Sequence, residues 1–234
     1  MSGFVAEGPG FFGKVRTHGD FVSRRLPPEF VTPWDERLQE GMLFARQTFG
    51  AQWLPIYLNA PLWCFVAGAG VCGTKAWAGV LMPGVDRVGR YFPFTIAVPL
   101  EGGELAGWLG GAQAWFDEAT QLALSTLAAD FVLERFDGQL TELGRTGGGQ
   151  AATAWRLTVA DASSAGEEFS DLLAACATPG SSAWWSEGSD AVPASLRVGA
   201  GLPDAQRFAS LLDAACLGAG WQTVVALRPV EAKQ

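Results

Sequence analysis

The sequence is poor in the residues that most often perform catalysis or bind metals. His18 is the only histidine, and no GxSxG or HExxH motif is present. His18 lies in the loop-like stretch "VRTHGDFVSRR", where we expect it to hydrogen-bond a turn. Cys64, Cys72, Cys176 and Cys216 form no CxxC pair, which favours reduced, structural thiols over a disulfide or zinc framework. We therefore expect no catalytic residue, no metal site and no cofactor.

The sequence also lacks a targeting segment and a long apolar run. The start, "MSGFVAEGPGFFGK", has no basic region followed by an apolar one, and no stretch approaches the ~18 uncharged apolar residues of a membrane span. Apolar residues nevertheless make up 49% of the chain, with ten tryptophans and fifteen phenylalanines, which predicts a globular fold. We expect a cytoplasmic protein without direct membrane insertion.

Basic residues are scarce in the second part of the chain. Residues 1–90 carry nine Lys or Arg against seven Asp or Glu, whereas residues 91–234 carry seven against seventeen. A nucleic-acid binder would need a basic stripe and a high pI, so we expect no nucleic-acid partner. The basic residues that do occur are concentrated at Lys14, Arg16, Arg24, Arg25, Arg87 and Arg90. This concentration is either solvated surface or a local patch for an anion or a partner.

One stretch has the glycine spacing of a dinucleotide-binding loop. In "FVAGAGVCGTKAWAGV", residues 65–80, Gly68, Gly70 and Gly73 have the GxGxxG spacing. A dinucleotide loop needs a helix that begins within the motif, because the helix N-terminus holds the pyrophosphate. The residues after Gly73 read as a strand and reach Pro83 ten residues later, so no helix fits. We expect a hairpin connection that uses positive φ angles instead.

Three apolar segments define the fold class. Residues 62–68, 76–82 and 92–98 are continuously apolar, so we expect strands whose two faces are both covered. The gaps between them are too short for parallel crossovers, which predicts an antiparallel meander. A helix is expected to begin after an N-cap at Thr32, with Pro33 at the first helical position, and to run to Phe49, with Gly50 ending it. The fold class is therefore α+β, with helices on both faces of a mainly antiparallel sheet.

The second half predicts further helices and strands around a loop. Apolar spacing favours a long helix over residues 105–131, a short helix over 169–176, a helix from about Asp204 and a last strand over 221–227. Glycines near 138–153 predict an internal loop within one domain spanning 1–234. Adjacent tryptophans in a strand point to opposite faces, so Trp184 and Trp185 are expected to be structural and buried on both sides of the sheet.

The segment "MPGVDRVGRYFPFTI" places charges between two buried strands. Asp86, Arg87 and Arg90 stand among glycine and proline at one end of the expected sheet. One interpretation is that Asp86 caps a turn while an arginine pairs with a nearby acid. The other is that the loop is a recognition element on a rigid scaffold.

Several blocks of the sequence resemble the TagF family of accessory proteins of bacterial type VI secretion. They include "GFFGK", "GDFV" and "RLP" near the start, "AWAGVLMPGVDRVGRYFP" in the middle and "SAWWSEG" later. They occur in the family's order from Gly10 to about Asp213, except over 138–180. The usual "SLWW" reads "SAWW" here. The resemblance implies an α-β-α three-layer, longin-like domain.

The resemblance also implies a non-catalytic function. It implies a cytoplasmic regulator that restrains type VI secretion after translation by binding the forkhead-associated scaffold protein of that system. We interpret six residues of the matching motifs as part of the contact surface: Lys14, Asp20, Arg24, Asp86, Arg87 and Arg90. Two alternatives remain at this point: a membrane-tethering longin-like module, and an enzyme with an unrecognised site near Asp86 to Arg90.

Overall fold

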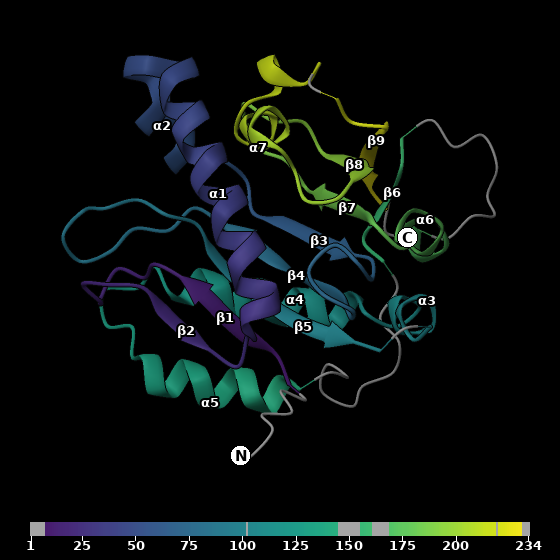
Figure 1. Ribbon diagram of the computed structural model, residues 1–234, viewed down its shortest axis with the longest axis horizontal. Coiled ribbons are helices and arrows are strands. Elements are labelled where there is room, and N and C mark those ends of the chain that lie inside the picture. Colours follow the sequence, from purple (N-terminus) through teal and green to yellow (C-terminus); the bar gives the residue numbers. More distant parts are fainter. Residues whose placement is uncertain (1–7, 102, 145–154, 161–168, 219, 231–234) are drawn as a thin grey trace.

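A nine-stranded antiparallel sheet organises the protein. The structure is a computed structural model that describes residues 8–101, 103–144, 155–160, 169–218 and 220–230. The strands are β1 (Gly10–Gly13), β2 (Val22–Arg24), β3 (Trp63–Ala67), β4 (Ala76–Met82), β5 (Phe94–Leu100), β6 (Leu157–Val159), β7 (Ser181–Ser186), β8 (Ser195–Ala200) and β9 (Thr223–Pro229). Their order across the sheet is β2-β1-β5-β4-β3-β7-β8-β9-β6 (Figure 1). The predicted meander is confirmed as β3-β4-β5.

Helices cover both faces of this sheet. They are α1 (Pro28–Phe49), α2 (Trp53–Leu58), α3 (Leu105–Leu109), α4 (Gln113–Ser125), α5 (Leu133–Leu143), α6 (Phe169–Cys176) and α7 (Ala205–Leu212), with 3-10 turns η1 (Gly50–Gln52) and η2 (Ala214–Cys216). One core lies under α1 and α7 and includes Trp34 and Trp184. The other lies under α4 and α5 and includes Phe116 and Trp185. The predicted three-layer α+β arrangement is confirmed, and the adjacent tryptophans point to opposite layers; the longin-like classification stays a prediction.

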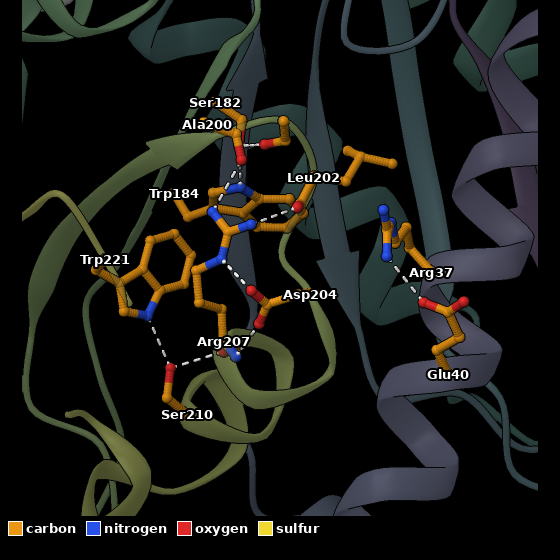
Figure 2. Close-up of polar contacts among 11 residues, drawn as sticks. Arg37, Glu40, Ser182, Trp184, Ala200, Leu202, Asp204, Arg207, Ser210 and Trp221 are labelled. Carbon is orange, nitrogen blue, oxygen red and sulfur yellow. Dashed lines mark hydrogen bonds and ion pairs between the residues drawn. The ribbon is translucent and has the colours of Figure 1, made fainter. Parts of the chain in front are cut away.

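Polar contacts of Arg207 fasten α7 to the end of β8 (Figure 2). Its guanidinium donates hydrogen bonds to the carbonyl oxygens of Ala200 and Leu202, both at 2.9 Å. It also pairs with Asp204 and lies 5.5 Å from the Trp221 ring centre. Asp204 caps the helix by accepting the Arg207 N–H, so the predicted start of this helix is confirmed.

Two helix boundaries differ from the prediction. The first helix begins at Pro28, with Pro27 as N-cap, and Pro33 lies inside it. Pro28 has the φ angle that suits a first helical position, whereas Pro33 removes only one hydrogen bond in a helix held by its buried face. Gly50 ends the helix as predicted, with a φ of 52°.

The expected helix over 105–131 is two helices. α3 ends before Gly110, and α4 begins at Gln113 and ends at Ser125. Two successive glycines lower helix stability by about 1 kcal/mol each, which is enough to separate them. The predicted first residue of the loop near 138–153 is also wrong, because residues 138–143 belong to α5. Its continuation over 145–153 lies outside the described residues.

Candidate functional site

Two connections meet at one end of the sheet. Residues 14–21 connect β1 to β2, and residues 83–92 lead from β4 to β5. Because β1 pairs with β5, both connections emerge close together. The Arg87 N–H donates to the His18 carbonyl oxygen at 2.8 Å, and the Arg90 guanidinium donates to the Gly19 carbonyl oxygen. We call residues 14–21 and 83–92 together the two-loop junction.

A buried carboxylate holds the two-loop junction together. Asp86 is only 2% exposed. Its Oδ2 accepts hydrogen bonds from Lys14 Nζ at 2.9 Å and Arg90 Nε at 2.6 Å. Its Oδ1 accepts the backbone N–H groups of Val88 at 3.0 Å and Arg90 at 2.9 Å. Four donors, two of them cationic, therefore converge on one side chain.

These contacts determine the ionisation state of Asp86. Burial alone would raise the pKa of Asp86, but the hydrogen bonds from Arg90, Lys14 and Val88 together lower it well below its usual range. Asp86 is therefore a carboxylate at neutral pH, and its acceptor positions are occupied by protein donors. The interpretation of Asp86 as a turn cap that pairs with an arginine is confirmed, and the pairing extends to Lys14.

Tyr57 of α2 holds the start of the loop that carries Asp86. The Tyr57 hydroxyl accepts the Gly84 N–H at 2.8 Å and donates to the Gly84 carbonyl oxygen at 3.0 Å. A Cβ atom at Gly84 would lie 2.4 Å from the Phe92 carbonyl oxygen and 2.6 Å from that of Lys14. Burial raises the pKa of Tyr57 far above its ordinary value, so the hydroxyl keeps its proton. The two-loop junction is therefore held from beneath by polar contacts and close packing.

The outer side of the two-loop junction is basic and apolar. Val88 is 67% exposed and Phe21 is 42% exposed. Arg16 and Arg87 are exposed, and within the described ranges neither has an ion pair. The Arg90 side chain is 56% exposed although its Nε binds Asp86. This surface therefore presents two cations that have no ion pair among the described residues, beside apolar side chains, on a chain with net charge −8.

The structure brings five of the six predicted contact residues together. Lys14, Asp86, Arg87 and Arg90 meet as described, and Asp20 is exposed beside them with its carboxylate accepting the Phe21 N–H at 2.8 Å. Lys14 and Asp86 are buried, so in this conformation they support the loops and do not form part of the contact surface. That part of the prediction is corrected because ion pairing draws both side chains into the protein.

Arg24 belongs to a different contact. It pairs with Asp137 at 2.5 Å and Glu134 at 3.6 Å, both on α5, so it connects β2 to that helix. The hydrogen bonds from Arg24 and Arg25 outweigh burial and lower the pKa of Asp137. Arg24 is therefore not among the residues that meet at the two-loop junction, and its part in a partner contact stays a prediction. Its partner, Asp137, is 113 residues away in the sequence, so no local pattern indicated the pairing.

Sequence reasoning missed Phe21, Val88 and Tyr57. Phe21 and Val88 lie next to residues that were singled out, and their apolar character within polar loops was the available signal. Nothing near Tyr57 in the sequence indicates its bond to Gly84. His18 lies in a turn as expected, with its N–H donating to the Val15 carbonyl oxygen at 3.1 Å and its Nδ1 3.0 Å from Thr17 Oγ1.

The glycine-rich stretch and the cysteines, considered above as possible chemical sites, have structural roles. Gly70 and Gly73 have φ angles of 88° and 85° in the β3–β4 hairpin, as expected for a tight connection. The four cysteines are unpaired thiols, and burial raises the pKa of each, in the case of Cys72 to about 12. In the part of the chain that the structure describes, no helix is long and apolar enough to span a membrane.

The sequence and the fold are both similar to those of known proteins. Residues 10–143 match the family model of the TagF N-terminal domain, described as type VI secretion system-associated. The crystal structure of PA0076 from Pseudomonas aeruginosa PAO1 is similar over most of the chain, with a TM-score of 0.72 and 38% sequence identity. The match covers 88% of this chain and 94% of PA0076. The curated proteins contain no significant match.

Proposed function

This chain belongs to the TagF family of type VI secretion-associated proteins, and we propose that it restrains type VI secretion after translation by binding the forkhead-associated scaffold protein of the system. In this proposal the chain is cytoplasmic and acts without catalysis. Bound to the scaffold, it occupies a surface that the scaffold needs for assembly at the membrane complex, so secretion stops while the complex persists.

The single observation that carries this proposal is the exposed tip of the two-loop junction. Arg87 and Val88 stand outward on a loop fixed from beneath by Asp86, Lys14 and Tyr57. A fixed loop loses little conformational entropy on binding, so its contacts contribute more of their energy to affinity. Exposed arginines beside apolar side chains suit an acidic protein surface, since arginine and aromatic residues are enriched in interfaces and opposite charges attract.

The same geometry favours binding over catalysis at Asp86 to Arg90. A general base needs a free lone pair within reach of a substrate. Asp86 is buried, and it accepts hydrogen bonds from Lys14, Arg90 and two backbone N–H groups. Protein binding is also favoured over lipid binding, because each arginine near an anionic membrane contributes only about 1 kcal/mol and the chain carries a net charge of −8.

An Arg87→Glu substitution is expected to weaken binding to the purified forkhead-associated scaffold protein by at least about tenfold. The substitution reverses the charge at the exposed tip, so it lowers the association rate and makes it less dependent on salt. Surface plasmon resonance at low and moderate ionic strength measures both the affinity and the association rate.

Arg135→Glu provides the matched control. Arg135 is exposed on α5 and, among the described residues, has no ion pair. The substitution makes the same change of net charge on α5, outside the residues of the two-loop junction, so affinity should remain within about twofold. Equal losses from both variants would show that net charge, and not the tip, determines binding. No loss from Arg87→Glu would remove the tip from the interface.

A further inference from the structure

The end of α1, together with η1 and α2, forms a surface segment with very little charge. Among residues 41–60 only Arg46 is charged, although 17% of the whole chain is charged. The preceding half of α1 is different, with Asp35, Glu36, Arg37 and Glu40 in succession on its exposed side. We call residues 41–60 the uncharged helix end.

Apolar side chains reach solvent on the uncharged helix end. Leu43 is 59% exposed and Leu58 is 52% exposed. The single cation, Arg46, lies 5.0 Å from the ring centre of Trp53 and so is placed over an aromatic face. Two large apolar side chains that are more than half exposed in a segment almost free of charge make this segment a candidate interaction surface.

The uncharged helix end is continuous with the two-loop junction. Tyr57 of α2 hydrogen-bonds Gly84 in both directions, and its ring lies 5.9 Å from the ring of Tyr91. Figure 1 shows α2 and the end of α1 projecting beyond the sheet on the side where the β4–β5 connection also emerges. The start of the loop that carries Arg87 and Val88 therefore packs directly against α2, in which the exposed Leu58 follows Tyr57.

The size of a specific interface also requires an extension of this kind. A stable protein complex buries roughly 800 Å² on each partner, contributed by about 20–30 residues. The exposed residues of the two-loop junction are too few to supply that area: Arg16, Asp20, Phe21, Arg87, Val88, Gly89 and Arg90. The adjoining surface with exposed leucines and no acidic residue is the uncharged helix end.

We propose that the scaffold's binding site is bipartite, with an acidic patch that faces the basic tip and an adjacent apolar surface that receives the uncharged helix end. This inference rests on the proposed function. The two parts act differently: the tip accelerates the encounter through its charge, and the helix end slows dissociation through apolar burial. Loss of the helix-end contact therefore changes the dissociation rate and leaves the salt dependence of association unchanged.

The test compares two double variants of the full chain. Leu43→Gln with Leu58→Gln removes apolar surface from the uncharged helix end and introduces no charge. Leu124→Gln with Leu127→Gln makes the same change at leucines that are 41% and 45% exposed, one in the last turn of α4 and one just after it. All four positions are exposed, so unfolding by denaturant should confirm that both variants fold. Surface plasmon resonance against the purified scaffold protein at two salt concentrations then measures both rates.

We expect the helix-end variant to dissociate about tenfold faster, with an association rate within about threefold of the unchanged chain at both salt concentrations. The α4 variant should match the unchanged chain. If the unchanged chain binds the scaffold and the helix-end variant binds equally well, the bipartite site is wrong while the proposed function stands. If the unchanged chain fails to bind, the proposed function fails and this inference fails with it.

Two further controls exclude other occupants of the uncharged helix end. Sedimentation of the chain alone detects self-association, and co-sedimentation with vesicles of phosphatidylglycerol and phosphatidylcholine detects lipid binding. Either signal, if abolished by the leucine substitutions, would assign this surface to a second copy or to a membrane and would overturn the proposal.

Discussion

The free energy of unfolding of an Asp86→Asn variant should be lower than that of the unchanged chain by about 3–5 kcal/mol, because the substitution leaves Lys14 buried without its counter-charge. Lys14 is 6% exposed, so water cannot replace the lost partner. The asparagine amide would also direct N–H groups toward the Lys14 ammonium and the Arg90 guanidinium, which are donors only. Chemical denaturation at neutral pH, followed by circular dichroism, measures the change.

A double-mutant cycle separates this effect from a general loss of packing. Lys14→Met alone should have a smaller effect, because Asp86 keeps Arg90 and two backbone N–H groups as partners. Lys14→Met combined with Asp86→Asn should be more stable than Asp86→Asn alone, since the unpaired cation is gone. An Asp86→Asn variant within 1 kcal/mol of the unchanged chain would contradict this account of the two-loop junction.

The contribution of Asp86 should also depend on pH in a defined direction. The pKa of Asp86 is lower in the folded protein than the ~3.9 of an unfolded chain. Its stabilisation is therefore fully present above about pH 5 and is lost as the pH falls toward the folded-state pKa. The stability difference between the unchanged chain and Asp86→Asn should be constant from about pH 5.5 to 8 and shrink below about pH 4. A difference that grows on acidification would have the wrong sign.

Trp184→Ala should lower the free energy of unfolding by about 3–5 kcal/mol, the range for removing a fully buried aromatic side chain. Trp184 is 1% exposed, and its ring centre lies 5.0 Å from that of Phe65 and 5.7 Å from that of Trp34. Its indole N–H donates to Ser182 Oγ at 2.9 Å. The substitution opens a cavity between α1 and the centre of the sheet, where backbone elements cannot easily close it.

Trp184→Phe is the control for this second stability prediction. It retains most of the aromatic contact and removes the hydrogen bond, so its loss should be clearly smaller than that of Trp184→Ala. Denaturation curves of the two variants at the same pH provide the comparison. Equal losses would mean that the indole N–H contact, and not ring packing, accounts for the stability at this position.

The strands of the sheet centre could be predicted because each is long and apolar. β4 and β5 have seven residues each and are buried throughout, so the continuous apolar run in each segment is enough to predict a strand. β1 and β2 have four and three residues, and β1 reads "GFFG", which is too short to show a period. α5 did carry a helical signal in Leu133, Phe136, Leu140 and Leu143, but the glycines that follow favoured a loop.

The candidate site was harder to predict than the sheet because its geometry comes from long-range pairing. Lys14 and Asp86 are 72 residues apart and meet only because β1 pairs with β5. The motifs singled out residues that the fold brings together at the two-loop junction, without showing which of them point inward. Burial separates the supporting pair, Lys14 and Asp86, from the exposed Arg87. Ion pairs with Asp137 and Glu134 connect Arg24 of β2 to α5.

The most direct test of the central claim is a secretion assay in the source bacterium lacking the gene for this chain. The deletion strain should release more type VI substrate into the medium, and the unchanged chain or Arg135→Glu should restore restraint. Arg87→Glu, present at equal cellular levels, should fail to restore it. Full restraint by an Arg87→Glu chain that no longer binds the scaffold would contradict the claim that this protein acts by occupying the scaffold through the two-loop junction.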